Sequence, residues 1–260
     1  MKNLMISIGT FFFKWRDTIL SLFLLAALVL VAFPGKDLPP IQELKEWKIS
    51  LTQEIVISVI GFLFVVAGQV VRAITIGWAY IKRGGLNKKI YAETLVRSGM
   101  FAHSRNPLYL GNLLIATGAL ISVNLFWYWI LVIPLVYFLY YCIIFAEEKF
   151  LRGKFGADYE AYEKEVNRLM LGNLKDWSKS TEGMSFTWKR LINKEHGSFV
   201  VIFAALAIYN LLKFHFRYGL AWTDPAAYAL YAVIAALLIF QTVAASLKRM
   251  HKLEWDPARP

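Results

Sequence analysis

Long apolar runs separated by polar segments dominate this chain. Residues 106–146 contain no charged side chain, and this run is twice as long as the roughly 20 residues that one membrane-spanning helix needs. Such a run must fold back on itself as a helical hairpin, with its turn around Ser122-Val123-Asn124. The pattern predicts an all-α membrane protein with about six transmembrane helices. The predicted spans cover residues 18–34, 55–80, 107–123, 125–146, 197–213 and 226–247.

The polar segment between spans four and five, residues 147–196, is too long to be a simple connector. Its charged side chains fill one side of a helical pattern. The apolar positions on the other side are Phe150, Leu151, Phe155, Tyr159, Tyr162 and Val166. This spacing predicts a cytoplasmic segment of one or two amphipathic helices at the membrane surface, interrupted at Gly153 and Gly156. A solvated loop with a helical turn or two is the alternative.

Composition and charge agree with a membrane protein. Hydrophobic residues make up 58% of the chain and charged residues 18%, against about 25% charged residues in a soluble domain. Six Lys and Arg residues lie in 81–106 and ten in 147–196, so the positive-inside rule places both segments, and both termini, in the cytoplasm. The net charge of +11 therefore indicates orientation in a membrane, such as a bacterial inner membrane, rather than nucleic-acid binding. Lys213 and Arg217 conflict mildly with this arrangement, because they fall outside.

The order of apolar and polar segments suggests a division of the chain into three parts. Residues 1–54 would hold the first span and an outer loop, 55–170 a catalytic core, and 171–260 a cytoplasmic connector with two further spans. A cleaved signal peptide is the alternative for the first apolar run. A retained helix is favoured because no A-x-A site precedes Pro34. Trp188-Lys189-Arg190 is typical of an interfacial anchor before span five.

Polar chemistry gathers where spans three and four meet the cytoplasm. Pro107 suits the first turn of a helix, so Arg105 and Asn106 would lie beside free backbone N–H groups that favour anions. Glu147 and Glu148 close span four, where acidic groups oppose the helix dipole and need compensation. The hairpin returns these carboxylates to Arg105, Asn106 and Tyr109. Pairing with the nearby Lys149 and Arg152 is the alternative, as is a plain helix start with a snorkelling arginine.

The combination of these two elements resembles a known signature. An Arg-[His/Asn]-Pro-x-Tyr-x-Gly motif, a hydrophobic stretch and Glu-Glu are similar to the isoprenylcysteine carboxyl methyltransferase superfamily, which includes bacterial relatives and phospholipid methyltransferases. Here the motif is read at Arg105–Gly111 and the two glutamates at Glu147-Glu148. The resemblance continues to Arg168 and covers about residues 60–170. It includes Gly99-Met100-Phe101 and an arginine in the preceding span, Arg72.

The resemblance implies S-adenosyl-L-methionine as cofactor, bound between the hairpin and the helices that follow it. It implies Arg72, Arg168 and Glu148 as catalytic residues. The implied cofactor-binding residues are His103, Arg105, Asn106, Pro107, Tyr109, Gly111, Glu147, Glu148 and Tyr159. Aromatic faces suit a sulfonium cation, and carboxylates suit ribose hydroxyls or the cofactor's ammonium.

Several residues depart from the family pattern or leave alternatives open. Asn106 stands where the best-known members have histidine, and an amide cannot transfer protons near neutral pH. His103 could take over part of that role or be an ordinary interfacial residue. Both prolines of the family's Val-Pro-Arg-x-x-Pro element are absent around Arg168. An arginine inside a span indicates function by default. Arg72 could therefore meet a substrate anion, pair with one of the two glutamates, or snorkel to the surface.

Three functions are open on this sequence. The favoured one is S-adenosyl-L-methionine-dependent methyl transfer to a small apolar or lipid-borne carboxylate, thiol or amine, with the lipid bilayer as partner and without nucleic acid or metal. An NADPH-dependent oxidoreductase resembling sterol C14 reductases is the second, although those carry a longer chain and a tyrosine near the position of Arg168. A non-catalytic transporter or membrane scaffold is the third. It predicts a polar track through the spans, for which the sequence offers few residues.

Overall fold

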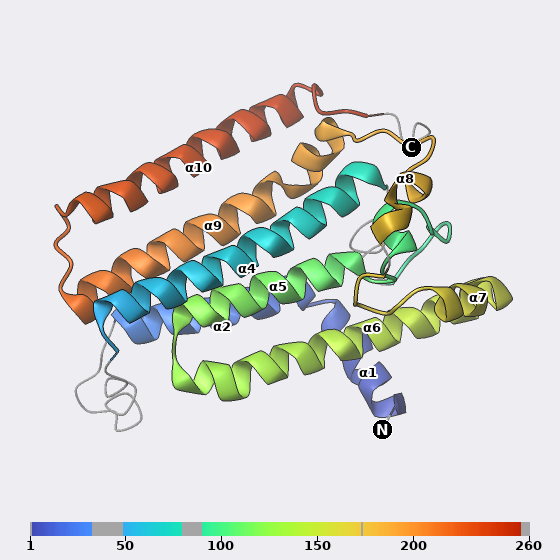
Figure 1. The fold of residues 1–260 in the computed structure, drawn as a ribbon, viewed down its shortest axis with the longest axis horizontal. Coiled ribbons are helices and arrows are strands. Elements are labelled where there is room, and N and C mark those ends of the chain that lie inside the picture. The colour runs from blue at the N-terminus through green and yellow to red at the C-terminus, as the bar shows by residue number, and fades with distance from the viewer. Residues whose placement is uncertain (1, 33–48, 80–89, 173, 256–260) are drawn as a thin grey trace.

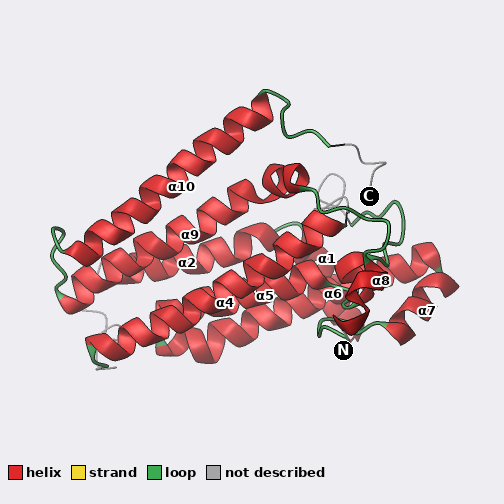
Figure 2. Ribbon diagram, turned by 45° about the horizontal axis from the view of Figure 1, so that its top comes forward, coloured by secondary structure: helices red, strands yellow, loops and turns green. Residues whose placement is uncertain are grey.

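The computed structural model describes residues 2–32, 49–79, 90–172 and 174–255, and within these ranges it contains helices and no strand (Figure 2). The elements are α1 (Lys2–Phe13), α2 (Arg16–Ala32), α4 (Leu51–Trp78), the 3₁₀ helix η1 (Gly99–Ala102), α5 (Pro107–Val123), the π-helical turn η2 (Tyr128–Val132), α6 (Ile133–Phe155), α7 (Ala157–Glu165), η3 (Leu174–Asp176), α8 (Trp177–Ser180), α9 (Trp188–Tyr218) and α10 (Pro225–Arg249). The predicted all-α class is therefore confirmed.

Six of these helices, α2, α4, α5, α6, α9 and α10, run along the bundle in alternating directions (Figure 1). One end, here called the α7 end, holds α7, α8, the start of α1 and the residues after α10. The opposite end, the hairpin end, holds the turn between α5 and α6. In the described residues four helices are long and apolar enough to cross a membrane, namely α4, η2 with α6, α9 and α10. α5 is apolar but shorter, with 17 residues. Six crossings, and their orientation, stay predictions.

Local sequence signals fix several helix ends. Ser50 and Gln53 form a capping box at the start of α4, and Asp224 accepts a hydrogen bond from the Ala226 N–H at the start of α10. Asn124 ends α5 in the left-handed conformation, with φ of 51°, a conformation that asparagine adopts more readily than most residues. This residue turns the chain back into α6, so the predicted hairpin around Ser122–Asn124 is confirmed.

Glycines bring α4 and α5 into close contact. A Cβ atom on Gly61 would lie 2.5 Å from the Gly118 carbonyl oxygen, and one on Gly68 would lie 2.5 Å from the Gly111 carbonyl oxygen. Small residues at seven-residue spacing on both helices therefore form the seam, as in many pairs of membrane helices. This packing holds the start of α5 rigidly against α4.

A buried ion pair fixes α9 at the hairpin end. The Lys213 ammonium lies 2.8 Å from Glu54 Oε1, and both side chains are fully buried. Glu54 Oε2 accepts hydrogen bonds from Asn124 at 3.0 Å and from the Tyr218 hydroxyl at 2.8 Å, and Arg217 lies 3.7 Å away. The two basic residues that conflicted with the charge rule are thus compensated by one carboxylate of α4.

The segment after α6 differs from the prediction in part. α6 continues to Phe155, about nine residues past the predicted span, and Gly153 lies inside it, so the predicted break at Gly153 is wrong. Gly156 does end the helix, with φ of 52°, and α7 follows. Glycine in a helix interior costs only about 1 kcal/mol relative to alanine, so one glycine need not break the helix. Tyr159 and Tyr162 of α7 are buried, whereas the predicted placement at a membrane surface stays a prediction.

Arg190 is not an interfacial anchor. Its side chain is 1% exposed and donates hydrogen bonds of 2.7 Å to the carbonyl oxygens of Ile76 and Gly77, the last turn of α4. A cation at a helix carboxyl end satisfies free carbonyls and interacts favourably with the dipole. Trp188 and Lys189 are exposed, and their role as an interfacial anchor stays a prediction.

Candidate active site

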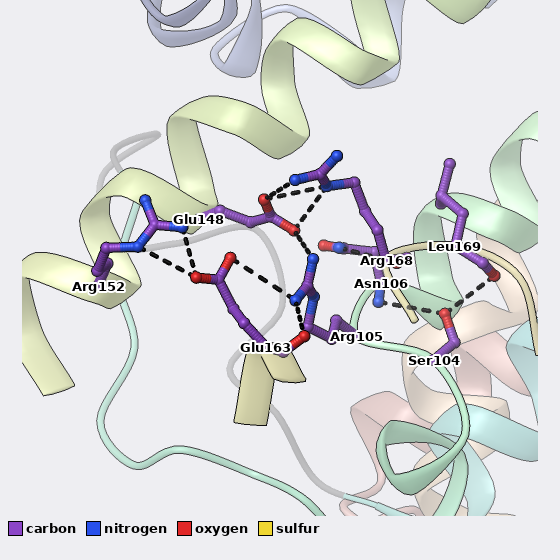
Figure 3. Close-up of polar contacts among 8 residues, drawn as sticks. All are labelled: Ser104, Arg105, Asn106, Glu148, Arg152, Glu163, Arg168 and Leu169. Atoms are coloured by element: carbon purple, nitrogen blue, oxygen red, sulfur yellow. Dashed lines mark hydrogen bonds and ion pairs between the residues drawn. The ribbon is translucent and has the colours of Figure 1, made fainter. Parts of the chain in front are cut away.

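Two chain segments meet at the α7 end and form the frame of the site. The Ser104 hydroxyl donates to the Leu169 carbonyl oxygen at 3.1 Å and accepts from the backbone N–H of Asn106 at 3.3 Å. The Asn106 amide donates to the Arg168 carbonyl oxygen at 3.1 Å (Figure 3). Asn106 therefore fixes the backbone of the segment after α7, and this frame carries Arg105 and Arg168 toward α6.

Glu148 is the centre of the site. Its side chain is 3% exposed, and one of its oxygens lies 3.0 Å from the Arg105 guanidinium. The Arg168 guanidinium approaches from the other side with contacts of 2.9 Å to both oxygens (Figure 3). Arg168 also lies over the Phe145 ring, 4.6 Å from its centroid. Hydrogen bonding to Glu148 raises the pKa of the Arg168 guanidinium, so this arginine stays charged.

A second carboxylate extends this network. Glu163 of α7 bonds to Arg152 with contacts of 2.5 and 3.1 Å, and its backbone oxygen accepts from Arg105 at 3.0 Å. Three guanidinium groups thus face two carboxylates, which leaves an excess of one positive charge. The Nε atom of Arg105 is buried and has no hydrogen-bond partner among the described residues. The site can therefore accept a further anionic or polar group.

Glu147 lies in a separate cluster on the other side of α6. Its carboxylate hydrogen-bonds the Tyr109 hydroxyl and lies 3.7 Å from the Arg16 guanidinium of α2. Arg16 also donates to the Tyr109 hydroxyl at 3.1 Å, and the Tyr109 ring packs edge-on against Tyr140. Glu147 is 23% exposed, so it is the more accessible of the two adjacent glutamates.

Arg72 pairs with neither of the two glutamates. Its guanidinium makes two contacts of 2.9 Å with Glu195 of α9 and a hydrogen bond to Asn112 of α5. Gly111 makes room for this side chain, because a Cβ there would lie 2.5 Å from Arg72 Cγ. Arg72 therefore connects α4 with α5 and α9.

The remaining predicted site residues pack around the centre. His103 is 3% exposed, stacks on Trp177 and bonds through Nε2 to the Ser180 hydroxyl at 3.0 Å, so it faces α8. Pro107 is buried at the first turn of α5. Tyr159 is 1% exposed, and burial, with the neighbouring Glu148 carboxylate, raises the pKa of its phenol.

Sequence reasoning missed three partners: Arg16, Glu163 and Glu195. Each is a charged residue that lies far along the chain from the group it compensates. Helix periodicity carries no information about such pairs. The described residues contain no group of three or more His, Cys, Asp or Glu side chains that could hold a metal ion.

Comparison with known proteins gives one match. Residues 56–158 match the family model described as phospholipid methyltransferase. No curated protein and no solved structure matches the chain. The matched region contains α4, α5 and α6 with Arg105, Glu147 and Glu148. It ends before Glu163 and Arg168, and it includes neither α1 and α2 nor α9 and α10.

Proposed function

We propose that this chain is a membrane methyltransferase that transfers a methyl group from S-adenosyl-L-methionine, because residues 56–158 match the family model described as phospholipid methyltransferase. The acceptor would be a small apolar or lipid-borne carboxylate, thiol or amine. One observation carries the proposal beyond the family. The signature residues Arg105 and Glu148 meet in one buried, positively charged cluster at the boundary of the bundle.

The residues present suit the chemical groups of this cofactor. Its carboxylate would take the excess positive charge near Arg105, whose Nε is unsatisfied, and its ammonium or ribose hydroxyls would bond to Glu148 or Glu163. Tyr109 and Glu147 supply an aromatic face and a carboxylate, the surroundings that stabilise a sulfonium cation. The fit is one of donor and acceptor types and of charge.

When bound, the cofactor supplies an activated methyl group on a positively charged sulfur. The protein's contribution is to hold the acceptor in line with that group, which converts an encounter into a positioned reaction. Arg105 and Arg168 hold Glu148 in place, so this carboxylate orients and does not exchange a proton. Glu147 has the long 3.7 Å ion pair and is accessible, so we assign to it the proton that an amine or thiol acceptor releases.

A turnover assay tests this function. Purified protein in lipid micelles would be given S-adenosyl-L-methionine labelled in the methyl group, with a membrane lipid extract and with simple thiol, amine and carboxylate acceptors. We expect label in an acceptor, a large loss of turnover in Glu147→Gln, and wild-type turnover in Glu160→Gln, whose carboxylate is exposed on α7. NADPH oxidation with the same extract, without methyl transfer to any acceptor, would replace the proposal by the reductase alternative.

A further inference from the structure

α1 packs against α6, and the two helices approach most closely at Gly9. At Gly9 the contact is so close that a Cβ atom would lie 1.8 Å from the Cys142 carbonyl oxygen. Beyond this crossing a cavity of about 260 Å³ lies between the first turns of α1 and the last turns of α6. Glu148 lines it, so the cavity adjoins the candidate active site.

The side chains around this cavity combine positive charge with apolar surface. The residues that matter are Lys2 and Ile6 of α1 and Phe145, Glu148, Lys149 and Arg152 of α6. On each helix these residues are three, four or seven positions from the first of them, so they lie on one face of that helix. Phe145 also lies under Arg168. The wall near the crossing is therefore apolar, and the rim is basic.

Two of the cations have no partner inside the described structure. Glu148 is bonded to Arg105 and Arg168, and Arg152 is bonded to Glu163. Lys2 and Lys149, in contrast, make no ion pair or hydrogen bond through their side chains with any residue the structure describes, and both are exposed. Two ammonium groups on opposite helices thus face the same opening, an arrangement that suits an anion with several oxygens.

The outer face of α1 suits lipid. Leu4 and Phe11 are each 64% exposed and lie on the side of α1 opposite Lys2 and Ile6. A helix with such a surface and flanking lysines belongs at the boundary between headgroups and acyl chains. The cavity volume is below the range of about 300–1,000 Å³ typical of sites for larger ligands, so it suits a headgroup better than a whole nucleoside cofactor.

We propose that the cavity between α1 and α6 is a binding site for the phosphate of an anionic lipid headgroup, held between Lys2 and Lys149. The glycerol end of the lipid packs against Ile6 and Phe145. α1 lies outside the residues that the family model matches. It requires only binding and does not depend on the proposed methyl transfer.

Binding of short-chain lipids to the detergent-purified full chain tests the site. Three probes separate the possible sources of the anion: dihexanoyl phosphatidate, dihexanoylglycerol with the same tails but no phosphate, and inorganic phosphate. We expect the phosphatidate to bind more tightly than either of the others. The double variant Lys2→Gln with Lys149→Gln should bind the phosphatidate about tenfold more weakly, because it lacks the electrostatic attraction of both lysines for the anionic headgroup.

The matched control removes two charges elsewhere at the α7 end. Lys179→Gln with Lys248→Gln, both exposed, should bind phosphatidate like the wild type. Equal binding by the two double variants, or by phosphatidate and dihexanoylglycerol, would overturn the site. Inorganic phosphate binding as tightly as phosphatidate would overturn the lipid assignment. S-adenosyl-L-methionine binding measured on the same samples reports separately on the proposed function, and the two results can fail independently.

Discussion

The buried pair of Glu54 and Lys213 allows a quantitative prediction. Both side chains are fully buried, and the ammonium lies 2.8 Å from one carboxylate oxygen. In Glu54→Gln the Lys213 ammonium keeps hydrogen bonds to the Ser58 hydroxyl at 2.9 Å and the Ser122 carbonyl oxygen at 2.7 Å, but no counter-charge at close range. Breaking a buried pair by removing one partner costs about 3–5 kcal/mol. We expect a loss of that size in the free energy of unfolding.

The same reasoning predicts recovery when the second charge is also removed. Glu54→Gln with Lys213→Met leaves no uncompensated ion in the bundle, so most of the lost stability should return. The measurement is tryptophan fluorescence during titration of mixed micelles with sodium dodecyl sulfate, using a double-mutant cycle. Glu160→Gln, an exposed carboxylate, is the control and should change stability by less than about 0.5 kcal/mol. A single variant that costs under about 1 kcal/mol, or a double variant no more stable than the single, would refute the reasoning.

Three further predictions rest on individual contacts. Gly9→Val places a side chain where the Cys142 carbonyl oxygen lies, so α1 should leave α6 and its backbone amides should exchange hydrogen faster, while those of α5 stay protected. Unchanged exchange in α1 would contradict the close crossing. Arg190→Met removes two hydrogen bonds to the end of α4 and should cost about 2 kcal/mol in the detergent titration, and a cost near zero would exclude the capping role. Burial raises the pKa of the Tyr159 phenol, so above about pH 10 the unfolded chain releases a proton that the folded chain keeps, and stability falls as pH rises. Tyr159→Phe should reduce that alkaline slope by the equivalent of one proton, and an unchanged slope would contradict it.

The helical architecture could be predicted because it follows from local pattern. Apolar runs located α4, α5, α6, α9 and α10, and Asn124 marked the hairpin turn. The meeting of Arg105 with Glu148 followed from that hairpin and from the charge that a membrane boundary cannot leave uncompensated. Arg168 joins the same carboxylate, a contact that the hairpin argument did not include. These inferences needed only the chain order and the length of a span.

Other features depend on partners that pattern cannot supply. Glu195 takes Arg72 away from the expected glutamates, and Glu54 compensates Lys213. In both cases the carboxylate and the cation come from helices separated by more than a hundred residues. The helix at residues 2–13 was not predicted. It packs against α6, where Gly9 fits closely against the Cys142 carbonyl, and such a tertiary contact leaves no local sequence pattern. α6 also continues through the exposed Gly153, because one glycine costs a helix only about 1 kcal/mol and need not break it.

Equilibrium binding of S-adenosyl-L-methionine to the purified chain tests the central claim most directly. The account predicts saturable binding of one molecule per chain by the wild type. It predicts binding at least about tenfold weaker in Glu148→Gln, since the neutral amide no longer holds Arg105 and Arg168 in place. Glu160→Gln should bind like the wild type. Absence of binding by the wild type, or equal affinity in the two variants, would contradict the assignment of the Glu148 centre as a cofactor site.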